Sequence, residues 1–219
     1  MFNVLLVAEG PTDAGREIYN EKKGKKEQSD GPIQIFIRRI MDDCSFAFTV
    51  RRPVDVKNFP LLRKGKYISP EDPVNEKLPG MAGRLCCDHI AYHQDVDANE
   101  FEIVYAKVRA HFINAENEDI PCLAIIPKRM IESWLLADTS LFGVDFTLPK
   151  PPEELWGKEK AGGNHPKDIM GMALAGLHKS DITEAFAELA WEADISVLLK
   201  KCPISFYTFY CDLLLWAAR

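Results

Sequence analysis

Acidic side chains follow several of the apolar runs that the sequence predicts to be β-strands. Glu9 directly follows the first run, and Asp13 comes one helical turn later. Asp95 and Asp97 form a D-x-D pair after a later run, and Glu132 follows a further run within a few residues. Because ligands of open parallel sheets bind beyond the carboxyl ends of the strands, we expect these acids to lie close together.

A cluster of acids without basic partners has a clear chemical use. Neighbouring carboxylates repel one another, and a bound divalent cation offsets that cost. Ligands that are all oxygen atoms favour Mg²⁺ or Mn²⁺ over Zn²⁺. The pattern therefore predicts a metal site built from Glu9, Asp13, Asp95, Asp97 and Glu132.

Each acid also has an ordinary structural interpretation. Asp13 suits the N-cap of a helix, and Glu132 suits a first helical turn, where the helix dipole stabilises negative charge. Glu9 alone can be a helix cap or a solvated turn residue, and D-x-D pairs are common in acidic turns. The metal hypothesis depends on the combination, because an acid would have to follow several separate strands by chance.

The elements that would position these acids alternate along the chain. Short apolar runs of strand character are followed by stretches whose apolar residues have helical spacing. Such runs are typical of parallel sheets that are buried on both faces. We therefore expect an α/β fold with a mostly parallel sheet flanked by helices. The predicted strands cover residues 2–8, 45–50, 89–94 and 122–126, and the predicted helices among them cover residues 33–41, 101–112 and 131–138.

Other segments are predicted to lie outside this alternation. A helix with Glu17 in its first turn would follow Glu9, and the lysine-rich stretch 20–31 is interpreted as a solvated loop. Residues 55–79 hold several prolines and many charges, which predicts a long excursion outside the sheet.

The chain changes character near residue 146, where a loop-rich link begins. We expect an α/β domain over residues 1–145 and a helical C-terminal extension over residues 146–219 that packs on it. Helical spacing of apolar residues in this extension covers residues 167–178, 182–192, 194–200 and 204–218.

Composition narrows the function classes. The 219 residues include 27 Lys and Arg against 33 Asp and Glu, a formal charge of -6, so no global basic field would hold the protein on nucleic acid. No apolar stretch approaches the roughly 20 residues of a membrane-spanning helix, and the first residues lack the features of a signal peptide. The cysteines include no C-x-x-C pair, which favours reduced thiols. We expect a cytoplasmic protein that does not associate with membranes.

Histidines offer a second set of candidate ligands. His89 and His93 are four residues apart and would share one face of a strand. Without a third ligand at suitable spacing, hydrogen-bonded and partly buried histidines are favoured, although a binuclear hydrolase site with His93 and the D-x-D pair stays open. His165 and Lys167 could reach a phosphate from the C-terminal extension, but a loop role is favoured for both.

The acidic motifs resemble those of a known family. Glu9-Gly10 in VAEGPTD and Asp95-Val96-Asp97 in HQDVD look like the signature motifs of the TOPRIM domain. In more detail, the chain is similar to small bacterial TOPRIM-like proteins related to the nuclease domain of overcoming-lysogenization-defect (OLD) proteins. This similarity covers most of the chain and includes the segments IPKRMIESWLLAD, NHPK and CPISF.

The resemblance implies a role for each acid. Glu9 would be a metal ligand or general base, and Asp95 and Asp97 would be the metal-binding pair. Asp13 would be the second acid of the first motif, and Glu132 a further acid near the centre of the site. The strand before the D-x-D pair is more polar here than is common in the family.

The function implied by the resemblance is Mg²⁺- or Mn²⁺-dependent cleavage of nucleic acid. The metal would lower the pKa of a bound water and stabilise the pentavalent phosphate, and Lys128 and Arg129 would steady the phosphate or its transition state. A topoisomerase would need a tyrosine nucleophile on a partner domain, which the sequence does not recognisably supply, so we favour a nuclease over a topoisomerase or a primase. No G-x-G-x-x-G or P-loop motif supports dinucleotide or ATP binding.

The resemblance also suggests a biological context. Such a nuclease would be the effector of a bacterial defence system whose ATPase is a separate chain. The rival hypothesis is a regulatory module that binds metal or a protein partner at the acidic crevice without catalysis and works with an ATPase. Lys128 or Arg129 pointing into the crevice would favour catalysis. The sequence leaves open whether the substrate is DNA or RNA and whether the protein forms a homodimer.

Overall fold

The structure is a computed structural model of the chain. It describes residues 2–8, 11–20, 25–43, 48–50, 54–55, 82–83, 86–97, 99–114, 120–156, 164–175 and 182–218. The candidate ligand Glu9 lies outside these residues, as does nearly all of the excursion predicted over residues 55–79.

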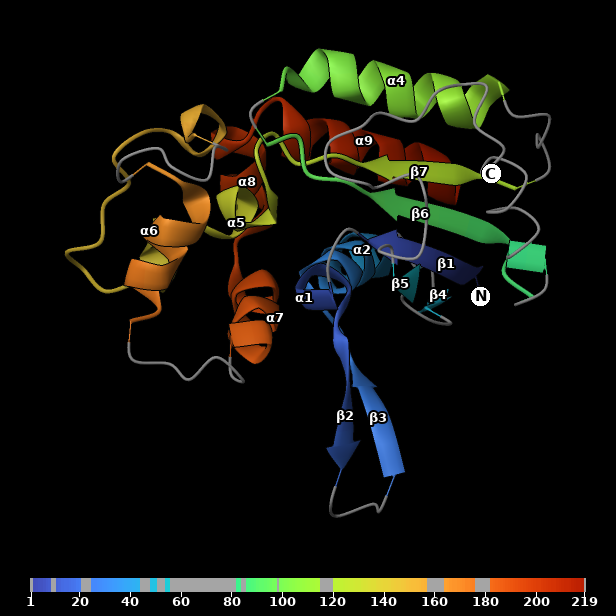
Figure 1. Cartoon of the computed structure of the whole chain (residues 1–219), viewed down its shortest axis with the longest axis horizontal. Coiled ribbons are helices and arrows are strands. Elements are labelled where there is room, and N and C mark those ends of the chain that lie inside the picture. Colours follow the sequence, from blue (N-terminus) through green and yellow to red (C-terminus); the bar gives the residue numbers. More distant parts are fainter. Residues whose placement is uncertain are drawn as a thin grey trace.

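A parallel β-sheet forms the centre of the molecule (Figure 1). Its strand order is β4-β1-β6-β7, and the short β5 also pairs with β1. Every pairing within the sheet is parallel, with Leu6 of β1 opposite Ala91 of β6 and Ala91 opposite Leu123 of β7. The predicted α/β class with a parallel sheet is therefore confirmed. The strands are β1 (Phe2–Ala8), β4 (Phe48–Val50), β5 (Val54–Asp55), β6 (His89–His93) and β7 (Cys122–Ile125).

Helices cover both faces of this sheet because alternate residues of each strand point to opposite sides. Val4 and Leu6 of β1 belong to a core shared with α2 (Pro32–Asp43) and the C-terminal helices. Leu5 and Val7 belong to a second core shared with α4 (Phe101–Asn114). The uninterrupted apolar run from Val4 to Ala8 of β1 is therefore explained by burial on both faces.

The C-terminal helices share the first of these cores. Trp134 is fully buried, and its ring contacts Phe36 of α2, Phe206 and Phe209 at centroid distances of 6.2, 5.0 and 5.3 Å. The ring cluster therefore joins the sheet side of the molecule to its C-terminal segment. The helices that follow β7 are α5 (Ile131–Leu135), η3 (Thr139–Leu141), η4 (Pro152–Glu154), α6 (Pro166–Ala173), α7 (Ile182–Glu192), α8 (Ile195–Lys201) and α9 (Ser205–Ala217).

The carboxyl ends of the central strands face one side of the molecule. In Figure 1 the arrowheads of β6 and β7 point toward the side that holds α5, α6 and α7. The segments that follow these strands therefore leave the sheet on the side of these helices.

The segment after β1 differs from the prediction. The prediction of a helix that carries Glu17 is wrong, because α1 (Pro11–Ala14) ends at Ala14 and Glu17 lies in β2 (Arg16–Asn20). The prediction of a solvated loop over residues 20–31 is also wrong in its second half, because residues 25–29 form β3 (Lys25–Ser29), which pairs antiparallel with β2. Gly15 has a φ of 79°, and a Cβ there would overlap the backbone carbonyl of Ser29, so only glycine permits this reversal of the chain. The hairpin extends away from the sheet (Figure 1).

Within the part of the chain that the structure describes, no helix has both the length and the apolar character needed to cross a membrane.

Candidate functional site

His93, the last residue of β6, lies between two of the predicted acidic ligands. Its Nε2 is 3.2 Å from Oδ1 of Asp95, and its Nδ1 is 3.9 Å from Oδ2 of Asp13. The His93 side chain is fully buried, while the two carboxylates are 10% and 13% exposed. Acids from separate motifs are therefore brought to one imidazole at the carboxyl end of β6.

The loop after β6 is tied to the loop after β7. Oδ1 of Asp95 accepts a hydrogen bond from the backbone N–H of Ile131 at 3.2 Å. The backbone N–H of Asp97 donates to the carbonyl of Arg129 at 2.7 Å. Nη1 of Arg129 donates in return to the carbonyls of Asp97 and Asn99 at 3.1 and 3.4 Å. These bonds hold the D-x-D pair against the start of α5.

The backbone at this junction is strained. Asp97 has a φ of 54° and Arg129 a φ of 104°, and neither residue is glycine. Positive φ is uncommon for residues with a Cβ, and it persists where surrounding contacts hold it, often at functional sites. Here the contacts are the hydrogen bonds between the two loops.

Glu132 lies in the first turn of α5 and is almost completely buried. It is 6% exposed, and its Oε2 accepts no hydrogen bond from any residue that the structure describes. Burial raises the pKa of its carboxyl group above the ordinary value, and Asp97 adds to this effect, whereas Lys167 and His93 oppose it. The carboxylate therefore keeps unused acceptor capacity close to the other acids.

Lys167 is the basic residue that the structure brings to these acids. Burial alone would lower its pKa, but the negative charges of nearby carboxylates outweigh burial and hold the pKa above its ordinary value. The ammonium group is therefore charged at neutral pH. The carboxylates that act on it, in order of effect, are those of Glu132, Asp95, Asp13 and Asp97.

The interpretation of Lys167 as a loop residue is wrong, because Lys167 lies in α6, whereas His165 lies just before that helix. His165 is the N-cap of α6, and its Nδ1 accepts a hydrogen bond from the backbone N–H of Lys167 at 3.2 Å. Pro166 occupies the first helical position, where its missing N–H carries no cost. The sequence His-Pro-Lys thus holds a helix-start signal that places Lys167 in a first turn.

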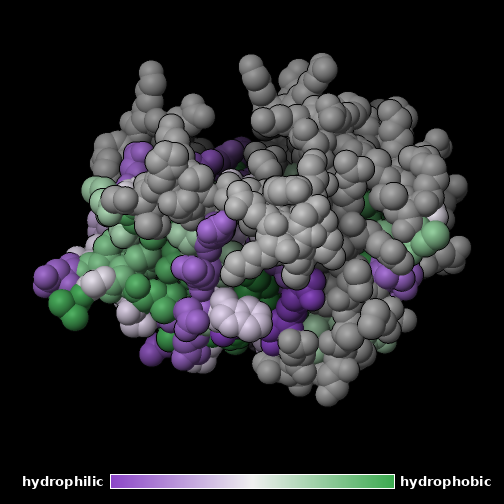
Figure 2. All heavy atoms as spheres, turned by 90° about the horizontal axis from the view of Figure 1, so that it is seen from below, coloured by the Kyte–Doolittle hydropathy of each residue, from purple (hydrophilic) through white to green (hydrophobic). Residues whose placement is uncertain are grey.

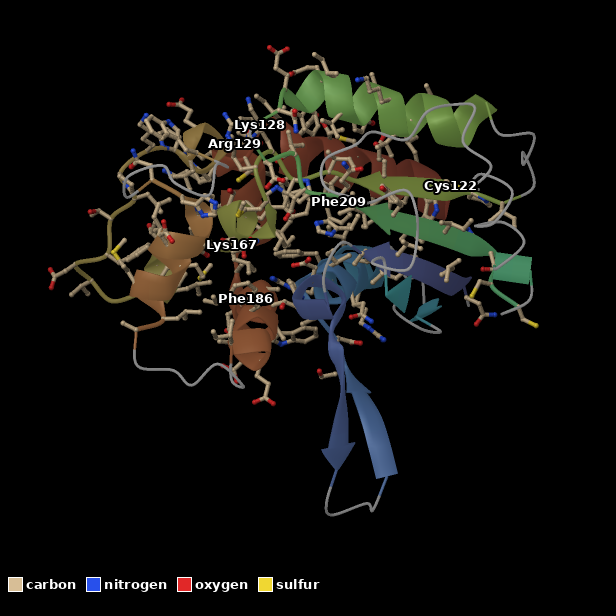
Figure 3. The ribbon with its side chains drawn as sticks, viewed as in Figure 1. Cys122, Lys128, Arg129, Lys167, Phe186 and Phe209 are labelled. Atoms are coloured by element: carbon tan, nitrogen blue, oxygen red, sulfur yellow. The ribbon has the colours of Figure 1, made fainter. Side chains whose placement is uncertain are left out.

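The basic residues predicted to meet the phosphate lie on the same side of the molecule as Lys167. Figure 3 shows Lys128, Arg129 and Lys167 beyond the carboxyl ends of β6 and β7. Lys128 is partly buried, and Arg129 binds backbone carbonyls through its guanidinium group. Arg129 therefore supports the D-x-D loop directly.

His89 is separated from this site although it lies on the same strand. Its Nδ1 is 2.8 Å from Oδ1 of Asp88, and its ring lies against Trp216 at a centroid distance of 4.8 Å. Four residues of extended strand span about 13 Å, so His89 and His93 act in different places.

The chemistry of the site fits a hard divalent cation, but only in part. The candidate donors Asp13, Asp95, Asp97 and Glu132 are all oxygen ligands, and each lies within electrostatic range of one ammonium group. Glu132 also contributes a buried oxygen without a hydrogen-bond donor. Among the described residues, however, no group of three or more His, Cys, Asp or Glu side chains is arranged to hold a metal ion. The metal site predicted from the sequence also includes Glu9, which lies outside the described residues.

Comparisons with known proteins add no family to this description. No protein-family model, no curated protein and no solved structure matches the chain.

Proposed function

We propose that this chain is a metal-dependent nuclease of TOPRIM type that hydrolyses phosphodiester bonds in nucleic acid. The observation that carries the proposal is the position of Lys167, a charged ammonium group within electrostatic range of the four predicted acidic ligands that the structure describes. Carboxylates beside a lysine supply both a place for a divalent cation and a positive group for a phosphate.

The TOPRIM assignment is supported by the position of its two motifs. Glu9-Gly10 directly follows β1, and the D-x-D pair follows β6. β1 and β6 are neighbouring parallel strands, so residues that follow them leave the same edge of the sheet.

Each acid of the site has a task in this proposal. Glu9, Asp95 and Asp97 would hold Mg²⁺ or Mn²⁺, with Asp13 and Glu132 available as further oxygen ligands. The bound ion would supply a water of lowered pKa and neutralise charge on the phosphate.

The neighbouring side chains position these acids. His93 contacts the carboxylates of Asp13 and Asp95 and limits their rotation. Arg129 fixes the backbone of the loop that carries Asp97. Lys167 would donate hydrogen bonds to non-bridging phosphate oxygens, where negative charge increases during hydrolysis.

The alternative proposal is a regulatory module that binds metal or a protein partner without catalysis and works with an ATPase. The observation that favours it is the missing three-ligand group among the described residues. The two proposals are distinguished by activity, because only a nuclease hydrolyses a phosphodiester bond.

The test combines cleavage with metal binding. Purified protein is incubated with DNA and with RNA in Mg²⁺ or Mn²⁺, alone and with the ATPase chain proposed as its partner, and Mn²⁺ binding is measured by calorimetry. We expect cleavage that EDTA abolishes. Glu9→Gln and Asp95→Asn should each lose metal affinity and reduce the cleavage rate at least about 100-fold, whereas Lys167→Met should lose cleavage while still binding metal.

Asp168→Asn is the matched control. Asp168 is exposed, follows Lys167 directly and has no part in the proposed site, so this variant should cleave like the wild type. Equal cleavage by wild type and by Glu9→Gln and Asp95→Asn would remove the assigned site. Metal binding without cleavage, with or without the ATPase, would favour the regulatory module.

A further inference from the structure

A cavity of about 310 Å³ lies beside the acidic cluster, between α6 and α7. This volume is at the lower end of the roughly 300–1,000 Å³ typical of small-molecule sites, so it suits one ring system and not a longer ligand. Figure 2 shows a continuous hydrophobic region on the side of the molecule where α6 and α7 lie in Figure 1. The cavity is lined by apolar residues including Met170, Leu174, Ile182 and Phe186, and by the charged residues Glu132 and Lys167.

The polar groups of the cavity have complementary hydrogen-bonding capacity. Burial raises the pKa of Glu132, but the charge of Lys167 opposes this effect and favours the ionised form. In the ionised form the carboxylate only accepts hydrogen bonds, and its Oε2 receives none from the described residues. The ammonium group of Lys167 only donates. A ligand that fills the cavity must therefore offer N–H donors to Glu132, because a buried acceptor without a partner is costly, and it can offer an acceptor to the exposed Lys167.

We propose that this cavity binds a guanine base. The Watson–Crick edge of guanine carries a carbonyl oxygen followed by two N–H donors, which matches one ammonium group and one carboxylate. The apolar side chains of Phe186 and its neighbours cover the faces of the planar ring. Lys167 belongs to both the cavity and the acidic cluster, so the bound base would lie next to the site of cleavage.

The other bases fit this arrangement less well. Adenine and cytosine place a ring nitrogen acceptor beside their amino group, and uracil flanks its single N–H with two carbonyl oxygens. Each of them would direct a lone pair toward the carboxylate of Glu132 and leave one acceptor unpaired. We therefore expect guanine to bind at least about tenfold more tightly than the other bases.

We take the guanine to belong to a nucleic-acid strand, and this part of the inference rests on the proposed function. Recognition of the base itself needs neither metal nor cleavage. The experiment therefore measures binding in EDTA. Calorimetry compares guanosine 5′-monophosphate with the adenosine, cytidine and uridine monophosphates, and then with a short single strand that contains one guanine. A strand without guanine is the reference.

Two variants separate base recognition from folding. Glu132→Gln should weaken binding of guanosine monophosphate at least about tenfold, whereas Glu188→Gln, at an exposed position of α7 outside the cavity, should not. Gly171 lines the cavity, and a Cβ there meets no atom within 4 Å, so Gly171→Leu should add a side chain at the cavity wall without a clash and weaken binding. Leucine also favours a helix more than glycine does, so this variant should fold at least as well as the wild type.

The outcomes are distinguishable from those of the nuclease test. Equal binding of all four mononucleotides, no binding of any, or unchanged binding in Gly171→Leu would each overturn the guanine site. Guanine-selective binding by a protein that cleaves nothing would keep the site and contradict the nuclease. Binding of the mononucleotide but not of the strand would identify the ligand as a free guanine nucleotide.

Discussion

Arg129 and Asp97 are joined by hydrogen bonds that run in both directions between the loops after β7 and β6. The N–H of Asp97 donates to the carbonyl of Arg129, and Nη1 of Arg129 donates to the carbonyl of Asp97. Both residues have positive φ, so this pair of contacts holds the strained backbone at the D-x-D motif. The geometry of Asp97 therefore depends on a residue 32 positions away in the chain.

Replacing Arg129 separates the backbone strain from the side-chain bonds. Arg129→Ala and Arg129→Gly both remove the guanidinium group, but only glycine relieves the positive φ of 104°. We expect the glycine variant to have a free energy of unfolding about 1 kcal/mol higher than the alanine variant, the reverse of the usual order. Denaturation in urea measures this difference. A more stable alanine variant would show that the backbone is relaxed at this position.

Gly31 controls the position of Asp13 through a close backbone approach. A Cβ at Gly31 would lie 2.5 Å from the carbonyl oxygen of Asp13, far inside van der Waals contact. We expect Gly31→Ala to destabilise the protein by about 2 kcal/mol or more and to move Asp13 away from His93. Gly143→Ala is the control, because a Cβ there meets no atom within 4 Å. Thermal unfolding of the variants tests the prediction, and equal melting temperatures would contradict it.

Glu153 caps the start of α9 from inside the protein. Its carboxylate accepts hydrogen bonds from the backbone N–H groups of Ile204 and Ser205 at 3.1 and 2.6 Å and from Oγ of Ser205 at 2.8 Å. Glu153→Gln replaces one acceptor with a buried N–H₂ group, so we expect a loss of about 2 kcal/mol in the free energy of unfolding. The neighbouring Glu154 is exposed, and Glu154→Gln should change stability by less than about 0.5 kcal/mol. Equal losses of unfolding free energy in the two variants would mean that the hydrogen bonds of Glu153 do not stabilise the protein.

Asp88 gives the protein a pH-dependent contact between β1 and β6. Burial alone would raise the pKa of its carboxyl group, but hydrogen bonds with His89 and the N–H of Asn3 lower it below the ordinary value of 3.8. A depressed pKa means that the stabilisation is complete above pH 3.8 and is lost as the pH falls through the lowered value.

Asp88→Ala should therefore destabilise the protein more at neutral than at acid pH. Because Asp88 is exposed, we expect the substitution to lower the free energy of unfolding by only about 0.5–1 kcal/mol at pH 7 and by less at pH 3. Unfolding curves of both proteins across this range give the comparison. A difference that grows toward acid pH would mean that the carboxylate is not the stabilised form.

Local pattern was enough to predict the strands that carry the acids. β1 and β7 are short and mainly apolar, whereas β6 begins and ends with a histidine, and all three are buried on both faces of the parallel sheet. The contact of Asp13 and Asp95 with one imidazole agrees with the expectation that they lie close together.

Other features depend on contacts that no local pattern records. The sequence predicts a helix that includes Glu17. In the structure the close approach of Gly15 to Ser29 ends the helix before Glu17 and begins a hairpin. Lys167 is far from the acids in sequence, and only the packing of α6 beside α5 brings it to Glu132. Its helix-start signal could be read from the sequence, whereas its electrostatic partners could not.

Lys167 provides the sharpest separation of metal binding from catalysis. Its ammonium group repels a divalent cation but attracts a phosphate. Removing this group should therefore strengthen metal binding and slow cleavage. We expect Lys167→Met to bind Mn²⁺ several-fold more tightly, by calorimetry, and to cleave nucleic acid at least about 100-fold more slowly. Lys200→Met, at an exposed position of α8, should change neither quantity. If Lys167→Met weakened metal binding and cleavage by the same factor, the lysine would support the fold of the site and would not act on the phosphate.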